Sequence, residues 1–154
     1  MRRVLGGMLL MVLASVAMAQ ESPATGWTLL DQYDKPYTAT ADLKVLLVAH
    51  DMAGSKLVKA ALADRPKGYL ESRSTAFVAD ISRMPAPISK LFAIPAMRDY
   101  SYRVLLDREP RVANRFPAKA DAVTWLQLEQ GKVVATRQFD SAQALRQALE
   151  QGEP

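Results

Sequence analysis

The 154-residue chain contains no cysteine and only one histidine, His50. Without a thiol it cannot supply a cysteine nucleophile, a disulfide, an iron–sulfur cluster or a cysteine zinc site. A single imidazole likewise excludes metal sites built from two or three histidines of one chain. Glycine is sparse as well, and no Gly-x-Gly-x-x-Gly motif follows a predicted strand, so the usual dinucleotide-binding fingerprint is missing.

The composition is otherwise that of an ordinary globular protein. Hydrophobic residues make up 49% of the chain and charged residues 23%. This balance excludes collagen-like, coiled-coil and acidic disordered chains, and the length favours one compact domain.

The first residues have the features of a secretory signal. Arg2 and Arg3 give a positive start, residues 4–19 carry no charge, and the run ends in Ala17-Met18-Ala19. A spanning helix would need about 20 apolar residues and an anchor. We therefore expect cleavage after Ala19, export to a bacterial periplasm and no stable membrane anchor in the mature chain.

The expected organisation of the chain is a signal peptide over residues 1–19, a flexible entry segment over 20–26 and one folded domain over 27–150. Cleavage would remove two of the cations behind the formal net charge of +4. The basic residues Arg108, Arg111, Arg115 and Lys119 alternate with Asp107, Glu109 and Asp121. Nucleic-acid binding needs clusters of one sign, so we expect a solvated face here and no nucleic-acid partner.

The remaining pattern alternates strands with helices. Strands are predicted over residues 27–31, 45–49, 76–79, 102–106, 123–128 and 133–139, with turn residues at 33–36 that indicate an N-terminal hairpin. Helices are predicted from Asp51 to about residue 62, over 85–95, and from Asp140 or Ser141 to Glu150. In the second helix, Ile88, Leu91 and Phe92 are expected to face the core, and Pro95 to kink or end the helix. This order predicts an α/β fold, a mixed sheet with helices on both faces.

The order of the elements and two local motifs resemble the thioredoxin-like fold in its peroxiredoxin and TlpA-like form. The apolar strand 45–49 runs into Asp51-Met52-Ala53-Gly54-Ser55-Lys56, where thioredoxins have Trp-Cys-Gly-Pro-Cys-Lys. The positions of the two redox cysteines therefore fall on Met52 and Ser55. The hairpin over residues 123–137 matches the C-terminal hairpin of that family, with Val123 at the position of its cis-proline. The resemblance extends over residues 27–150.

The resemblance implies a groove that accepts an extended peptide. By position, its lining residues are Met52, Ala53, Gly54, Ser55, Val123 and Thr124. Neither Met52 nor Ser55 can form a thiolate, so dithiol exchange and cysteine peroxidase chemistry are excluded. The sequence is thus interpreted as an exported, redox-inactive binding module without a cofactor, whose partner is a periplasmic protein or an extended peptide.

A second candidate site is a polar cluster at the ends of the predicted strands, where α/β sheets gather their ligand sites. It consists of His50, Asp51, Asp80 and Asp107. Such a cluster could bind a hard cation or act as acid and base. Aspartate at a strand end commonly caps the next helix or turn, and this interpretation is preferred.

Three further hypotheses stay open. Ser55 and His50 could form a hydrolase pair, although no Gly-x-Ser-x-Gly elbow frames the serine. His50 and Met52 form a His-x-Met pairing like that of periplasmic copper proteins, without further soft ligands nearby. Similar small exported proteins are labelled FAD/FMN-containing dehydrogenases, and a flavin could stack on aromatic side chains. The candidates for such stacking are Trp27, Tyr100, Tyr102 and Trp125, which would otherwise pack in the core.

Overall fold

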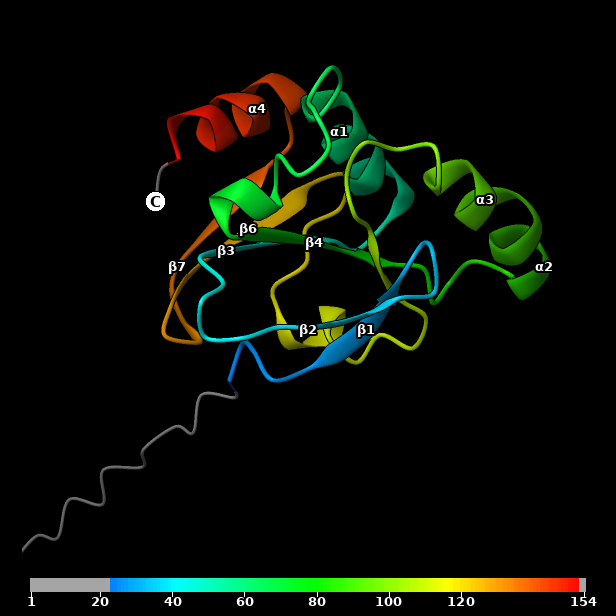
Figure 1. The fold of residues 1–154 in the computed structure, drawn as a ribbon, viewed down its shortest axis with the longest axis horizontal. Helices are drawn as coiled ribbons and strands as arrows, with labels where there is room; N and C mark the ends of the chain where they lie inside the picture. The colour runs from blue at the N-terminus through cyan, green and yellow to red at the C-terminus, as the bar shows by residue number, and fades with distance from the viewer. Residues whose placement is uncertain (1–22, 153–154) are drawn as a thin grey trace, which may run out of the picture.

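The computed structural model describes residues 23–152, which fold around one seven-stranded sheet (Figure 1). The strand order is β2-β1-β5-β4-β3-β6-β7. The strands are β1 (Thr28–Asp31), β2 (Pro36–Thr38), β3 (Val45–Ala49), β4 (Thr75–Asp80), β5 (Leu105–Asp107), β6 (Val123–Glu129) and β7 (Lys132–Phe139). The helices are α1 (Met52–Ala61), α2 (Ala86–Ile88), α3 (Ile94–Met97) and α4 (Ala142–Gln151), with short turns η1 (Glu71–Arg73), η2 (Ser89–Ala93) and η3 (Ala113–Arg115). The expected signal peptide lies outside the described residues.

The centre of the sheet is the uninterrupted apolar strand β3. All five of its residues are buried, as expected for a strand covered on both faces. It pairs in parallel with β4 and antiparallel with β6, and β4 in turn pairs in parallel with β5. The predicted N-terminal hairpin is present as well, with Thr28 opposite Thr38. The predicted α/β class with a mixed sheet is therefore confirmed.

Alternate residues of β3 point into two separate cores. Val45, Leu47 and Ala49 pack under α1, α4 and α3, while Leu46 and Val48 pack against the N-terminal hairpin and η3 on the other face. Figure 1 shows α1, α3 and α4 on one side of the sheet. Helical structure thus lies on both faces, but on the second face it amounts to the single turn η3.

The stretch α2–η2–α3 differs from the prediction. Ile88, Leu91 and Phe92, which were expected to face the core, are exposed at 49%, 68% and 69%. The side chains that do face inward are those of Ser89, Ile94 and Met97. Leu91 and Phe92 lie in η2, a π-helical turn, whose extra residue rotates side chains relative to the α-helical pattern. Ile88 lies before this turn, at the end of α2. Pro95 does not end the helix at once, because the chain continues as α3 to Met97.

Strand β5 also begins later than predicted, at Leu105 and not at residue 102. The cause is the buried side chain of Gln32, which binds the backbone that would otherwise extend the strand. Its Nε2 donates to the carbonyl of Tyr102 at 2.9 Å, and its Oε1 accepts from the N–H of Val104 at 2.9 Å. The Gln32 side chain therefore binds the Tyr102 carbonyl and the Val104 N–H, which a longer strand β5 would use to pair with a neighbouring strand.

The end of the expected entry segment packs against the domain. Ala24 is buried, and its N–H donates to the carbonyl of Gly131 in the β6–β7 turn at 3.1 Å. The indole of Trp27 donates back to the carbonyl of Ala24 at 2.8 Å. Among residues 23–152, contacts with the domain are thus made already by Ala24, three residues before the expected boundary.

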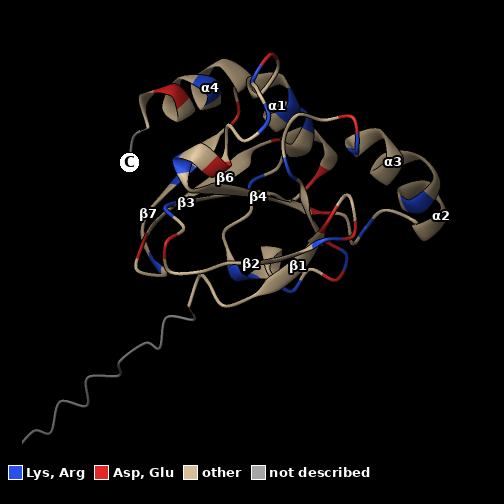
Figure 2. Cartoon of the chain, in the orientation of Figure 1, with Lys and Arg blue, Asp and Glu red and all other residues tan. Residues whose placement is uncertain are grey.

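The charged residues after β5 lie in a mixed surface. Arg108 faces Asp34 at 3.5 Å, and Lys119 faces Asp140 at 3.8 Å. Figure 2 shows blue and red interspersed over most of the domain. Within residues 23–152, every helix is too short or too polar to cross a lipid bilayer.

Candidate functional site

The start of α1 is held by the side chain of Asp51. One carboxylate oxygen accepts from the N–H of Gly54 at 2.7 Å, which is an N-cap, and the other accepts from the N–H of Asp121 at 3.0 Å. Burial raises the pKa of the Asp51 carboxyl, but these hydrogen bonds and His50 outweigh it, so the pKa lies below its ordinary value. Asp51 therefore joins the helix to the loop before β6.

On the β6 side of α1, the residues that the structure describes are in close contact. Gly54 is buried, and a Cβ placed on it would lie 2.5 Å from the carbonyl oxygen of Ala122. Val123 and Thr124, which were expected to line the groove, are fully buried, and the peptide bond before Val123 is trans. The Thr124 hydroxyl is 2.8 Å from the carbonyl of Pro117, inside the protein. These residues close the interface between α1 and β6.

On the opposite side of α1 there is an apolar cavity of about 150 Å³, here called the α1 cavity. It is lined by Met52, Ser55, Lys56, Lys59, Phe77, Ala79, Met97, Tyr100, Tyr102 and Val104. Two of the expected groove residues, Met52 and Ser55, thus line this cavity, and Met52 is 56% exposed beside it. Ala53 is only half-buried and does not line it. Of the expected groove residues, Gly54, Val123 and Thr124 thus lie in the closed interface with β6. Met52 and Ser55 line the cavity on the other side of α1.

The wall of the α1 cavity is aromatic and its charges are positive. The rings of Tyr100 and Tyr102 stack with their centroids 5.1 Å apart, and the Lys59 ammonium lies 5.0 Å from the Tyr100 centroid. Burial, and next the neighbouring Tyr100, raise the pKa of Tyr102 far above its ordinary value, so its hydroxyl stays protonated. No carboxylate is among the lining residues.

Sequence reasoning missed most of this cavity. Lys56, Lys59 and Met97 were not predicted as site residues, and Tyr100 was considered only for flavin stacking. These residues come from α1, from α3 and from the loop after α3. One local signal was available: Lys56 and Lys59 lie one turn after Met52 and Ser55 on the same helix, at the spacing that puts side chains on one face.

The strand-end polar residues serve as caps and turn acceptors. The fully buried Asp107 carboxylate accepts from the N–H groups of Val112 at 2.9 Å and Ala113 at 2.8 Å. His50 Nε2 donates to the carbonyl of the same Ala113 at 3.0 Å, while its Nδ1 is buried without a partner. Asp80 accepts from the N–H of Ser82 at 2.9 Å.

These roles account for all four members of the predicted cluster. Two of them, His50 and Asp107, hold the η3 loop, Asp51 caps α1, and Asp80 closes a turn. Within residues 23–152 there is no group of three or more His, Asp or Glu side chains that could hold a metal ion. The same part of the chain has no hydrogen bond between Ser55 and His50, the pair considered for hydrolysis.

The four aromatic residues considered for flavin stacking lie in different places. Trp27 packs against Tyr37 on one face of the sheet, and Trp125 packs against Phe139 in the core of the other. Only Tyr100 and Tyr102 stack beside a cavity. The structure therefore brings two of the four together.

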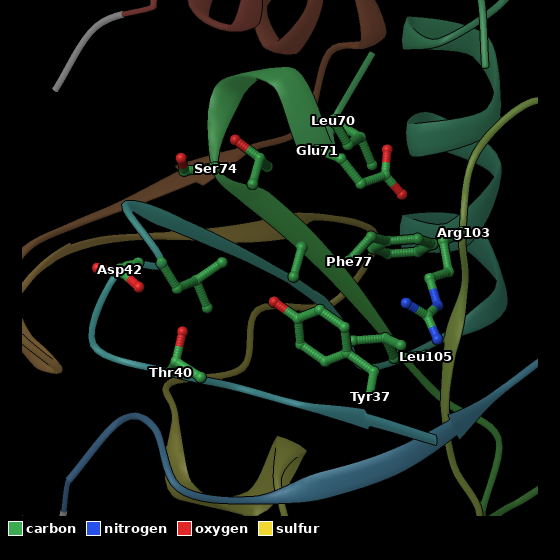
Figure 3. Close-up of a pocket in the computed structure, with 12 residues that line it drawn as sticks. Tyr37, Thr40, Asp42, Leu70, Glu71, Ser74, Phe77, Arg103 and Leu105 are labelled. Atoms are coloured by element: carbon green, nitrogen blue, oxygen red, sulfur yellow. The ribbon is translucent and has the colours of Figure 1, made fainter. Parts of the chain in front are cut away.

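A second cavity, of about 240 Å³, lies between β2, η1 and the start of β4 (Figure 3). Figure 3 shows the Tyr37 hydroxyl pointing into it, with Asp42 and Glu71 on opposite sides. Arg103 is already held there, because its Nε donates to Asp31 at 2.8 Å and its guanidinium lies 5.2 Å from the Tyr37 ring. The polar groups of this cavity do not converge on one point.

Solved structures share this fold at low sequence identity. A secreted disulfide oxidoreductase from Mycobacterium tuberculosis is 10% identical, with a TM-score of 0.52 over 83% of this chain and 97% of its own. A peroxidoxin from the same organism is 17% identical, with a TM-score of 0.50 over 82% of this chain and 96% of its own. An exposed lipoprotein thioredoxin from Streptococcus pneumoniae is 17% identical, with a TM-score of 0.50 over 81% and 98%.

At the level of sequence, neither a family model nor a curated protein matches the chain. Identities this low establish the fold and leave activity to be argued from the residues. The shared topology covers more than four-fifths of the chain in each comparison. The chain therefore has the thioredoxin-like fold, although it contains no cysteine.

Proposed function

We propose that this protein is an exported binding module without redox chemistry, which holds an extended segment of a partner protein at the α1 cavity. The observation that carries the proposal is the place of Met52 and Ser55. They stand at the positions expected for the redox cysteines, and both line an apolar cavity beside the start of α1. An apolar side chain of the partner enters this cavity, and the exposed Met52 side chain packs against it.

The charges around the α1 cavity favour a particular kind of segment. Lys56 and Lys59 line the cavity, and its lining includes no carboxylate. A segment with Asp or Glu next to the apolar residue would pair with these ammonium groups, and a basic segment would be repelled. Because no thiol is available, the capture is non-covalent and reversible.

Export is supported by the N-terminal residues, with their positive start, uncharged run and small residues before Gln20. The names of two structural neighbours agree, since one is described as secreted and another as an exposed lipoprotein. In such a compartment a protein without cysteine is not affected by the local disulfide chemistry.

A displayed peptide library selected on the purified protein tests the proposed site. We expect enriched peptides to carry an apolar residue next to Asp or Glu, and to bind by fluorescence anisotropy. Met52→Asp and Lys59→Glu should each weaken this binding about tenfold, which corresponds to loss of one well-packed or paired contact. Val134→Asp, at a residue 52% exposed on β7, is the matched control.

The result that contradicts the proposal is equal peptide affinity for the Met52→Asp variant and the wild type. Misfolding does not explain a loss in this variant, because Met52 is exposed at the first turn of α1, where an acidic side chain favours the helix. An unchanged thermal midpoint checks this. If no peptide is enriched over an unrelated protein, the binding role itself fails.

We propose no cofactor for the α1 cavity. The test is an absorption spectrum and a metal analysis of the protein purified from the periplasm without chelator. We expect a colourless, metal-free sample. Visible flavin bands would contradict the binding-module proposal and favour a flavin-dependent oxidoreductase. Stoichiometric copper would favour a metal site at His50 and Met52.

A further inference from the structure

The stretch α2–η2 exposes three large apolar side chains side by side. Ile88, Leu91 and Phe92 are exposed at 49%, 68% and 69%, and the last two are the most exposed large apolar residues among those described. Ile88 ends α2, and Leu91 and Phe92 follow three and four positions later in the π-helical turn η2. We call Ile88, Leu91 and Phe92 the apolar face.

The fold itself gives no reason for this exposure. The opposite side of the same stretch supplies Ser89, Ile94 and Met97 to the protein interior, so the segment is anchored without the apolar face. Figure 1 shows α2 and α3 projecting at the end of the molecule away from β7. A group of exposed large apolar residues on a monomeric domain commonly marks an interaction surface.

The charged residues nearest in sequence to the apolar face are cations. From residue 81 to residue 98 the chain carries Arg83, Lys90 and Arg98 and no carboxylate. Within the part of the chain that the structure describes, Arg83 and Lys90 form no ion pair, and Figure 2 shows blue without red on the helical stretch between α2 and α3. Asp80 and Asp99 border this stretch, and Arg98 lies 3.8 Å from the Asp34 carboxylate. The positive charge beside the apolar face therefore depends on Arg83 and Lys90.

We infer that α2–η2 docks this protein onto an anionic phospholipid surface. A helical segment that exposes Leu and Phe and carries Lys or Arg beside them has the chemistry for this, because the apolar side chains enter the acyl boundary while the cations pair with lipid phosphates. Three side chains offer far less than the roughly 800 Å² that each partner gives a stable protein interface. The inference does not involve the α1 cavity.

Vesicle flotation tests the docking, using the full chain as the cell processes it. We expect the protein to float with phosphatidylglycerol vesicles at low salt, and to do so less at high salt and with phosphatidylcholine vesicles. The double variant Leu91→Ser/Phe92→Ser should lower the partition coefficient at least about tenfold. Lys90→Glu should weaken it too, and Val134→Ser, on the exposed face of β7, should leave it unchanged.

Several results would overturn the inference. The first is that the protein does not float with phosphatidylglycerol vesicles at low salt, and the second is that it floats equally well with phosphatidylcholine vesicles. If the double variant floats as well as the wild type, any lipid contact lies elsewhere in the chain. Since Leu91 and Phe92 are two-thirds exposed, the double variant should keep the wild-type thermal midpoint. A photocrosslinker at position 91 that captures a protein in cells, while vesicles capture none of the wild type, would assign the apolar face to a protein partner.

Discussion

Gly54 lies directly against the carbonyl oxygen of Ala122, so that a Cβ on Gly54 would come within 2.5 Å of that oxygen. The contact joins the first turn of α1 to the loop before β6. Asp51 strengthens the same junction, because its carboxylate accepts from the N–H of Asp121 at 3.0 Å. Together the two contacts explain why the β6 side of α1 is closed and the α1 cavity lies on the other side.

Gly54→Ala should destabilise the protein although alanine is the better helix former. Helix propensity favours alanine by about 1 kcal/mol. The new methyl group, however, meets a backbone oxygen that cannot move like a flexible side chain, and overpacking of this kind costs about 1–3 kcal/mol. We expect the free energy of unfolding in urea to fall by a net amount of up to about 2 kcal/mol.

The matched control is Ser55→Ala at the next position of α1, where added helix propensity meets no such contact. It should leave the free energy of unfolding equal or slightly higher. If Gly54→Ala is as stable as Ser55→Ala, the junction between α1 and Ala122 is looser than described.

Asp51 should make the stability of the protein depend on pH in the acidic range. Its folded pKa is lowered, so the fold favours the charged carboxylate, and the stabilisation is present above the ordinary Asp pKa of about 3.9. It is lost as the pH falls through the lower, folded pKa. Asp51→Asn keeps a capping side chain but no charge. Urea unfolding at pH 7 and pH 3 should show a smaller loss on acidification for this variant than for the wild type, and equal losses would contradict the assignment.

The fold was predictable because its signals are local. The run 45–49 is apolar without interruption, as expected for a strand covered on both faces, and the structure buries all five residues. The C-terminal helix begins where Ser141 was a predicted cap, with its hydroxyl accepting from the N–H of Ala144. Such patterns depend on the residues of a single helix or strand, so they can be recognised without knowing how the other elements pack.

The site was less predictable because its determinants are contacts between distant residues. Gly54 was placed in a peptide groove, and only its approach to Ala122 shows that this side is closed. The α1 cavity depends on Tyr100, which is 41 positions after the cavity residue Lys59 in the sequence. The π-helical turn η2 breaks the spacing on which the inward placement of Leu91 and Phe92 was predicted.

Gln32 should be among the polar residues whose loss costs most stability. It is buried, and its amide satisfies the carbonyls of Met97 and Tyr102 and the N–H of Val104. Gln32→Leu leaves these buried groups without partners, each at about 1–3 kcal/mol. We expect a loss of at least about 2 kcal/mol and faster hydrogen exchange at Val104.

An exposed glutamine provides the comparison for Gln32. Gln143→Leu, on the solvent side of α4, should change the free energy of unfolding by less than about 0.5 kcal/mol. A similarly small effect of Gln32→Leu would mean that water molecules, in place of the Gln32 amide, satisfy the buried backbone groups.

Asp107 and His50 should act together on the η3 loop, since Asp107 accepts the N–H of Ala113 and His50 donates to its carbonyl. Asp107→Asn removes a buried charge that accepts from Val112 as well, and should lower the free energy of unfolding by about 2–4 kcal/mol. His50→Ala should cost less, because it loses one hydrogen bond. In the double variant the two losses should not add, with a coupling energy of about 0.5 kcal/mol or more.

The same variants separate a structural role of Asp107 from a ligand-binding one. If the strand-end residues hold the η3 loop, hydrogen exchange at Val112 and Ala113 rises in both single variants, while peptide affinity at the α1 cavity stays at the wild-type value. If Asp107 instead belongs to a binding site, the affinity falls without a matching rise in exchange. Additive losses in the double variant would show that His50 and Asp107 support different parts of the loop, because independent contacts contribute separately to the free energy of unfolding.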